Sequence, residues 1–350
     1  MNKRRILVAP LNWGLGHATR CIPIIQALEN NGFEPLLASD GIALALLKKE
    51  FPHLTALELP SYKIQYAQNE AYFKWKLIQQ IPNMVKAVRH ERKTVEKWIQ
   101  QFDISGIISD NRLGVHSKKT PSVFITHQLN VLTGNTSWFT TKIHHFFIRK
   151  FDICWVPDVA RKPNLSGRLG HLKETTLNLK YIGPLSRFHK KDLEEIYDLM
   201  VILSGPEPQR TLLEEKLRLE LKNYNGNILF IQGVIEEEQK SSKRFNLTCY
   251  NFMGSTELET AFNQSKMVLS RSGYTTIMDL AKLGKKAFFI PTPGQYEQEY
   301  LAKKLKKKGI VPSSKQSDFK IEHLLQTDIY QGLKNIADEE PDWEELFSLF

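Results

Sequence analysis

Short apolar runs rich in β-branched residues alternate with longer helical patterns along this 350-residue chain. Continuous apolar runs are typical of strands buried on both faces, and strand–helix alternation is typical of a parallel sheet covered by helices. The alternation pauses at Gly183-Pro184 and the charged stretch 187–195, and then restarts. The sequence therefore predicts two Rossmann-like α/β domains, residues 1–185 and 186–350, with the last helix free to pack back on the first domain.

The expected strands are the most apolar of these runs. They are 5–10, 35–39, 104–110, 122–126 and 153–157 in the first domain, and 199–204, 227–231, 267–270 and 286–291 in the second. Helices are expected over 19–30 and 43–50. Because ligands of open α/β sheets bind at the carboxyl ends of the strands, the loops that follow these strands are where a site is expected.

Composition excludes several classes of protein. A hydrophobic content of 41% can supply a core to both domains, and no stretch approaches the roughly 18 apolar residues of a membrane-spanning helix. The first apolar run is short and is interrupted at 12–14, which favours a strand over a signal peptide. The three cysteines, Cys21, Cys154 and Cys249, stand far apart in the sequence, so neither a disulfide framework nor a metal site is expected. The cytoplasm is therefore the expected compartment.

Positive charge is concentrated in the first domain. Residues 1–185 carry 25 Lys and Arg against 13 Asp and Glu, whereas residues 186–350 carry 23 against 25, which together give the net charge of +10. Positive potential attracts nucleic acids, anionic membranes and acidic substrates alike. No stretch resembles a nucleic-acid-binding motif, so no nucleic-acid partner is expected.

Residues 70–100 interleave seven Lys or Arg with apolar and aromatic side chains at helical spacing. An amphipathic helix of this composition can lie on an anionic membrane surface, where each nearby cation contributes about 1 kcal/mol. Most stripes of this kind face a protein core instead. Both alternatives stay open, and with them attachment to the inner face of the membrane.

The loop after the first strand carries Gly14, Gly16 and His17. The two glycines allow a tight turn into a helix whose amino end can face an anion. A dinucleotide site would need a third glycine where Thr19 stands and an acid such as Asp40, which makes it the weaker interpretation. Imidazole titrates near neutral pH, so His17 is a candidate general base, with a packing or capping histidine as the alternative.

Two loops of the second domain offer hydrogen-bond donors. Ser204 and Gly205 end a strand, and Arg210 follows at the start of a helix, where it can add charge near an anion; a Pro-rich turn is the plain alternative. Further on, Ser272-Gly273 opens a helix whose amino end, with the hydroxyls of Thr275 and Thr276, suits a diphosphate. Asp279 lies one turn deeper, where a carboxylate can accept ribose hydroxyls, and the next loop, 291–300, suits a polyhydroxyl sugar.

These motifs resemble those of GT-B glycosyltransferases, and the chain is most similar to the MurG-like family, family 28. The best-known member of that family adds N-acetylglucosamine to a lipid-linked peptidoglycan precursor. The likeness runs from Gly14 to Gln298 and is strongest over 267–302. It implies two Rossmann-like domains whose parallel sheets face each other across a cleft.

The resemblance assigns roles to single positions. His17 matches the histidine of the family's first glycine loop, and Asp279 stands where the family has a glutamate that binds ribose. Glu299 stands where the family often has a second glutamine, so both departures bear on the donor sugar. The remaining matches are Ser204, Gly205 and Gln209 in the second glycine loop, Ser272, Gly273 and Thr276 at the diphosphate, Gln298 with neighbouring Gln295 at the donor sugar, and His127 and Asn130 facing the acceptor.

The resemblance implies an enzyme that transfers a sugar from a nucleotide donor, most simply a UDP-sugar, to an acceptor hydroxyl. His17 would deprotonate the acceptor, most simply with inversion, and Asp110, at a strand end, would orient His17 or cap a helix. The cleft loops hold no Asp-x-Asp pair, so neither a metal nor another cofactor is expected. A sugar-nucleotide epimerase or hydrolase of the same shape, a nucleic-acid-binding protein and a non-catalytic scaffold are the alternatives; donor sugar and acceptor stay open.

Overall fold

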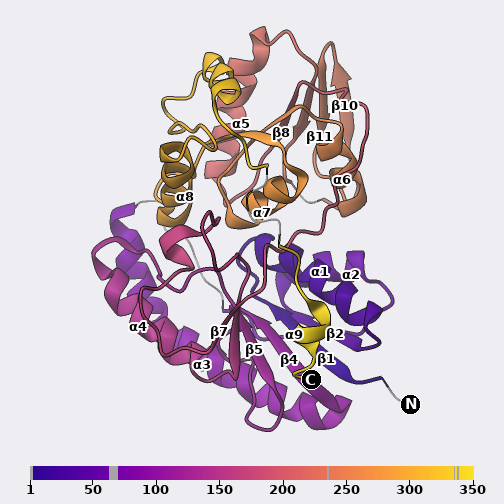
Figure 1. Ribbon diagram of the computed structural model, residues 1–350, viewed down its shortest axis with the longest axis vertical. Coiled ribbons are helices and arrows are strands. Elements are labelled where there is room, and N and C mark those ends of the chain that lie inside the picture. Colours follow the sequence, from indigo (N-terminus) through magenta and orange to yellow (C-terminus); the bar gives the residue numbers. More distant parts are fainter. Residues whose placement is uncertain (1–2, 63–69, 235, 335, 337–338) are drawn as a thin grey trace. The chain divides into compact units, whose positions relative to one another are not determined.

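The computed structural model describes residues 3–62, 70–234, 236–334, 336 and 339–350, with side chains in the long helix described from Met84 onward (Figure 1). The chain divides into two compact units. Unit 1 comprises Met1–Ala160, Arg168–Leu185 and Glu339–Phe350, and unit 2 comprises Arg161–Gly167 and Ser186–Asp338. These units differ from the predicted ranges in two segments, because 161–167 belongs to unit 2 and 339–350 belongs to unit 1.

Unit 1 contains a seven-stranded sheet in the order β3-β2-β1-β4-β5-β6-β7, and every neighbouring pair is parallel. Such a sheet needs crossover helices, and the chain supplies them between the strands. The strands are β1 (Arg5–Pro10), β2 (Glu34–Ser39), β3 (Ala56–Glu58), β4 (Ile104–Asp110), β5 (Ser122–Ile125), β6 (Ile153–Val156) and β7 (Leu179–Tyr181).

The helices of unit 1 cover both faces of this sheet, α1 and α2 on one side and α3 and α4 on the other (Figure 1). Val95 of α3 packs with Leu7, Leu36 and Ile107 in one core cluster. Ile148 of α4 packs in a second cluster around Phe124 of β5. The helices are α1 (Gly16–Asn30), α2 (Gly41–Glu50), α3 (Glu70–Phe102), α4 (Ser137–Ile148) and α9 (Trp343–Phe347), with short 3-10 turns at Gly134–Thr136 and Gly167–Leu169.

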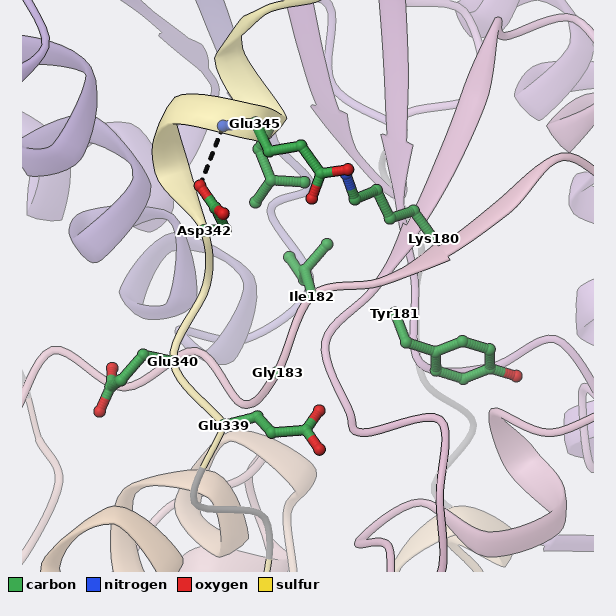
Figure 2. A pocket seen from close by; sticks show the side chains of 9 residues that line it. Lys180, Tyr181, Ile182, Gly183, Glu339, Glu340, Asp342 and Glu345 are labelled. Atoms are coloured by element: carbon green, nitrogen blue, oxygen red, sulfur yellow. Dashed lines mark hydrogen bonds and ion pairs between the residues drawn. The ribbon is translucent and has the colours of Figure 1, made fainter.

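The carboxyl-terminal segment, 339–350, is bound to unit 1 (Figure 2). Lys180 of β7 forms an ion pair with Glu345 at 2.6 Å, and the two residues line a cavity of about 130 Å³ beside Gly183. Gly183 has a positive φ of 78°, and a Cβ atom there would lie 2.4 Å from the carbonyl oxygen of Glu339. Only glycine permits this close approach, so the Gly-Pro pair at the predicted domain boundary also makes room for the returning chain.

Unit 2 contains a six-stranded sheet in the order β10-β11-β9-β8-β12-β13. Its core is formed by Leu199, Val201, Phe230, Leu269 and Phe288, contributed by four of these strands, and by residues of α5. The strands are β8 (Leu199–Ile202), β9 (Ile228–Ile231), β10 (Ser241–Arg244), β11 (Leu247–Tyr250), β12 (Met267–Ser270) and β13 (Lys286–Phe289). The helices are α5 (Gln209–Glu220), α6 (Ser255–Asn263), α7 (Tyr274–Leu283) and α8 (Tyr296–Lys307), with 3-10 turns at Leu221–Asn223 and Ile321–Ile329.

The prediction of α/β units built on parallel sheets is confirmed, with one correction. β10 pairs with β11 in the antiparallel direction, and both strands are absent from the predicted set. All four residues of β10 are exposed and polar, Ser241-Ser242-Lys243-Arg244, so the strand carries no apolar signal. A charged edge strand of this kind prevents pairing with another sheet.

Candidate active site

The sheet order of unit 1 places the carboxyl ends of β1, β4 and β5 side by side. Residues that follow these strands therefore meet at one edge of the sheet. His17 lies in the first turn of α1, and its Nδ1 is 2.8 Å from Oδ1 of Asp110, the last residue of β4. The His17 side chain is 17% exposed and the Asp110 side chain is fully buried. The structure thus brings the predicted base and the predicted orienting carboxylate into contact.

Helix α1 begins at Gly16, three residues before the predicted start. Gly14 has a positive φ of 73°, a conformation that favours glycine. The turn at Gly14 and the early start of the helix place His17 within reach of β4. The glycines therefore position the histidine, whichever ligand the helix end meets.

Asp110 is held as a carboxylate. Burial raises its pKa, but the Arg20 guanidinium and His17 oppose burial and lower the pKa to about 2. Arg20, one turn after His17 on the same helix, donates from Nε and Nη2 to the two oxygens of Asp110. Arg20 is not among the predicted site residues; its spacing of three residues from His17 was the available signal.

The two residues predicted to face the acceptor have different surroundings. His127 follows β5 and is buried, with Nδ1 3.0 Å from Nη1 of Arg20, so it joins the His17–Asp110 cluster. The Asn130 side chain donates to the carbonyl oxygen of Arg168. The Asn130 backbone N–H donates to the carbonyl oxygen of Leu169 at 2.8 Å. Asn130 thus fastens a loop within unit 1.

A second buried network lies beside this cluster and bears on the dinucleotide interpretation. The Arg112 guanidinium is fully buried and donates to Asp40 and, at 2.9 Å, to Glu91, which also accepts a hydrogen bond from Tyr62. Burial raises the pKa of Glu91 to about 7, against the lowering effect of Arg112. Asp40, the acid that a dinucleotide site would need, is instead the partner of a buried arginine.

In unit 2 the neighbouring strands β8, β12 and β13 bring three loops together. Ser204 and Gly205 follow β8 and are exposed, and Gly205 has a φ of +107°. A Cβ atom on Gly205 would lie 3.8 Å from the Thr292 hydroxyl, which comes from the loop after β13. The second glycine loop and the predicted sugar loop are therefore adjacent.

The Ser272-Gly273 turn has the predicted form, with Gly273 as the N-cap residue of α7. Ser272 is buried, and its hydroxyl donates to the carbonyl oxygen of Gln298 at 2.8 Å. Thr275 and Thr276 lie half-buried in the first helical turn. Gly273 and the two threonines therefore surround the amino end of α7, while Ser272 holds α8 against that end.

Asp279 lies on α7, where the sequence places it, but it already has a partner. Its Oδ1 accepts a hydrogen bond from the Ser186 hydroxyl at 2.7 Å, and the residue is 7% exposed. Burial raises the pKa of Asp279 to about 6, and nearby Arg187 and Ser186 lower it only in part. A ribose ligand would have to share the carboxylate with Ser186 or replace it.

Gln298 and Gln295 shape the loop after β13. The side-chain oxygen of Gln298 accepts a hydrogen bond from the backbone of Thr292 at 2.9 Å. Gln295 is the N-cap residue of α8, and its backbone donates to the carbonyl oxygen of Thr292 at 3.1 Å. Glu299 accepts a hydrogen bond from the Gly294 backbone at 3.1 Å. The side chains of Gln298 and Glu299, in the first turn of α8, therefore hold the backbone of the loop that precedes the helix.

Two arginines of unit 2, Arg210 and Arg271, differ in what their side chains bind. Arg210 is paired with Glu207 and Glu214 and also donates to the carbonyl oxygen of Gln232, so two carboxylates neutralise its charge. Arg271 is buried and donates to the carbonyl oxygens of Gln209, Ile290 and Pro291 at 2.8–3.2 Å. Burial lowers the pKa of Arg271 to about 10. Arg271, which is not among the predicted site residues, ties the three loops together.

Three polar atoms beside these loops lack a partner. Within the described residues, Oε1 of Gln209, Nε of Arg271 and Oγ1 of Thr292 are buried without a hydrogen bond. Buried polar atoms are usually paired, so such atoms at a loop cluster point to a missing ligand or water. In the described part of the chain, no three His, Cys, Asp or Glu side chains gather as a metal site would require. None of the helices described combines the length and apolarity needed to cross a bilayer.

Comparisons with known proteins agree with this arrangement. Residues 207–346 match the glycosyltransferase family 28 C-terminal domain. The chain is 22% identical over 323 residues to a protein of Haemophilus ducreyi and 23% identical over 347 residues to one of Buchnera aphidicola. These alignments cover 89% and 93% of this chain and 85% and 89% of the relatives. Both relatives are named UDP-N-acetylglucosamine–N-acetylmuramyl-(pentapeptide) pyrophosphoryl-undecaprenol N-acetylglucosamine transferase.

Solved structures of similar fold are also glycosyltransferases. SnogD from Streptomyces nogalater is 11% identical with a TM-score of 0.63, and all of both chains is covered. MurG from Acinetobacter baumannii is 14% identical with a TM-score of 0.56 over 99% of each chain. The fold and the matched domain define the chain as a glycosyltransferase of the GT-B class. Within that class it is similar to MurG, and its residues 207–346 match the family 28 carboxyl-terminal domain.

Proposed function

We propose that this protein transfers N-acetylglucosamine from UDP-N-acetylglucosamine to a hydroxyl group of a lipid-linked acceptor. The observation that carries the proposal is the family 28 match over 207–346, because that range contains the Ser272-Gly273 turn, Asp279 and Gln298. The names of the Haemophilus and Buchnera relatives support the donor and the lipid-linked acceptor. An acceptor of this kind would place the reaction at a membrane surface, on the cytoplasmic side where nucleotide sugars are available.

His17 is the proposed general base. With a proton on Nδ1 donated to Asp110, its Nε2 can remove the proton of the acceptor hydroxyl as that oxygen attacks the anomeric carbon. The bond from the anomeric carbon to the diphosphate oxygen breaks, UDP leaves with that electron pair, and a single displacement inverts the configuration. The ionised Asp110 stabilises the imidazolium that forms, which is the purpose of a carboxylate behind a catalytic histidine.

The proposed donor site is the loop cluster of unit 2. The amino end of α7, with Gly273 and the hydroxyls of Thr275 and Thr276, offers a positive helix dipole and donors to the diphosphate. Stabilisation by the helix end would let the leaving group depart without a metal. A ligand group above Gly205 would supply the partner that Thr292 lacks. Asp279 would accept ribose hydroxyls, and Gln298 and Gln295 would contact the sugar.

We also propose that helix α4 docks unit 1 on an anionic membrane. Its outer face exposes Trp138 (69%), Phe139 (57%) and Phe146 (58%). Lys142 lies 4.1 Å above the Trp138 ring and Lys150 lies 4.6 Å above the Phe146 ring. Aromatic rings with cations beside them fit the interface of an anionic bilayer, where rings enter the headgroup region and cations meet phosphates.

The surface expected at 70–100 is described only in part. Side chains 70–83 lie outside the described residues, so that part of the expectation stays untested. Near the end of α3 the apolar stripe faces the core: Val95 is fully buried, and Trp98 and Ile99 pack against the same cluster, whereas Val85 is 39% exposed. Among the described residues, the aromatic side chains exposed on a helix of unit 1 belong to the next helix, α4.

The nucleotide assignment can be tested by thermal unfolding with UDP and, separately, with NAD. A ligand at about 100 times its Kd stabilises by about 2.7 kcal/mol, which for a domain of this size raises Tm by roughly 5–10 °C. We expect that rise with UDP and a negligible one with NAD. Equal shifts, or none with UDP, would remove the nucleotide assignment. In a reaction with UDP-N-acetylglucosamine and acceptor, release of free sugar would favour the hydrolase alternative. Formation of an epimer would favour the epimerase alternative.

A further inference from the structure

The Arg20 side chain links the predicted base to the predicted acceptor-side histidine. Arg20 is 2% exposed, and all three of its guanidinium nitrogens have partners. Nε and Nη2 donate to the two oxygens of Asp110, Nη1 lies 3.0 Å from Nδ1 of His127, and Nη2 lies 2.9 Å from Nδ1 of His17. One buried cation thus contacts the same ring atom, Nδ1, of both histidines.

The partner of His127 fixes where its proton sits. A guanidinium group has five N–H donors and no acceptor, and it stays protonated in proteins. The His127 Nδ1 atom, 3.0 Å from Nη1, must therefore present a lone pair. His127 is then neutral and carries its single ring proton on Nε2.

His17 has the opposite requirement. Its Nδ1 lies 2.8 Å from Oδ1 of Asp110, which is ionised. A lone pair facing a carboxylate oxygen at this distance is repelled, whereas an N–H forms a charge-assisted hydrogen bond. Nη2 of Arg20 already donates to the same Oδ1, so the contact with His17 is not needed to satisfy it. The favourable proton position is therefore Nδ1, which leaves the lone pair on Nε2.

We propose that Arg20, together with Asp110, is a positioning residue that keeps the two histidines in opposite tautomers: Asp110 holds the proton of His17 on Nδ1, and Arg20 holds the proton of His127 on Nε2. His17 then presents a basic nitrogen and His127 a neutral N–H donor, the pair needed to take a proton from an acceptor hydroxyl while the acceptor is held. This use rests on the proposed function, whereas the tautomers themselves do not.

Other titratable groups around the cluster leave this arrangement intact. Cys21, also on α1, lies 3.8 Å from Oδ2 of Asp110, and burial raises the pKa of its thiol, so it remains neutral. On α4, burial lowers the pKa of His144 to about 4, so His144 brings no charge near His127 at neutral pH. Within the described residues, Arg20 and Asp110 are the charged side chains seen to contact the two histidines.

The tautomers can be measured on the full chain labelled with ¹⁵N at histidine. Two-bond correlations between ring nitrogens and carbon-bound protons show which nitrogen carries the proton, and His17→Gln and His127→Gln variants assign the signals. We expect His17 protonated on Nδ1 and His127 protonated on Nε2 at pH 7.5. His127 protonated on Nδ1, or present as imidazolium, would overturn the proposal, because Arg20 cannot accept a hydrogen bond.

An Arg20→Lys variant tests whether Arg20 is the cause. Lysine keeps a cation beside Asp110, but it lacks the planar guanidinium that reaches both histidines. We therefore expect the Nε2–H form of His127 to lose its dominance. We also expect kcat to fall more than tenfold while UDP affinity stays within twofold of wild type. Unchanged tautomers in a folded variant would contradict the role of Arg20. If the variant does not fold, the wild-type spectrum still decides. A chain with the expected tautomers that does not bind UDP would defeat the proposed function alone.

Discussion

At the scale of single residues, the buried arginines organise both candidate sites. Arg20, Arg112 and Arg271 are each at most 2% exposed, and each lies at the carboxyl edge of a sheet. A buried arginine needs several partners. Arg20 has the carboxylate of Asp110 and two histidines, Arg112 has two carboxylates, and Arg271 has three carbonyl groups. Each guanidinium therefore fixes loops that come from distant parts of the chain.

Replacing Asp279 by asparagine is expected to raise the stability of the fold and to weaken UDP binding. Its folded-state pKa of about 6 lies above the ordinary value of 3.8, so the fold favours the protonated form. Stability is therefore lost as pH rises from about 4 through 6, by about 3 kcal/mol once the buried group is ionised. We expect Asp279→Asn to be more stable than wild type at pH 7.5, to match it near pH 4, and to bind UDP at least tenfold more weakly.

Urea unfolding at the two pH values and UDP titration measure these effects. Asp318→Asn, an exposed aspartate of the same unit, is the matched control, and we expect no change in either measurement. Equal stability differences at both pH values would contradict the assigned titration. Unchanged UDP affinity in Asp279→Asn would remove its role at the ribose.

At the scale of elements, α4 carries the membrane prediction. Replacing Trp138 and Phe146 by alanine removes two large exposed rings, each of which contributes about 1.5–3 kcal/mol when buried. We expect the double variant to bind phosphatidylglycerol vesicles at least tenfold more weakly than wild type, with Tm unchanged. Phe245→Ala, at a fully exposed phenylalanine of unit 2, is the control and should bind as wild type does. Equal binding by the double variant and wild type, or self-association through α4 in place of vesicle binding, would contradict the prediction.

The elements also show how far the sequence could predict the structure. Strands such as β1 and β4 were predictable because both faces are buried and their apolar runs are unbroken. β10 was not, because an exposed edge strand needs no apolar residue, and β3 and β7 have three residues each. Helix α4 was missed as a surface because Trp138 and Phe146 have the spacing of a core-facing helix, and only the fold shows which face is turned outward.

The candidate site was predictable to the extent that sheet topology determines it. His17 and Asp110 follow strands that are neighbours in a parallel sheet, so their contact follows from the element order. The partners of Arg20 and Asp279 do not follow from it. Arg20 reaches Asp110 and His127 across 90 and 107 residues, and Asp279 meets Ser186 across 93. Side-chain reach and burial, which no local pattern encodes, decide these contacts.

At the scale of the whole molecule, each unit carries one half of the proposed reaction. Unit 1 holds the His17–Asp110 pair and the aromatic face of α4, which suits an acceptor at an anionic membrane. Unit 2 holds the family 28 domain and the loops that are proposed to bind the nucleotide. The carboxyl-terminal segment returns to unit 1, so the chain passes between the units more than once.

The central claim is tested most directly by following radiolabelled N-acetylglucosamine from UDP-N-acetylglucosamine to a polyprenyl-diphosphate-linked sugar in anionic vesicles. We expect label on the lipid with wild type, a rate about 10²–10⁴-fold lower with His17→Ala at unchanged UDP affinity, and a wild-type rate with His53→Ala, at an exposed histidine. Labelled lipid formed equally fast by His17→Ala, or no labelled lipid from a wild-type chain that binds UDP, would contradict the account.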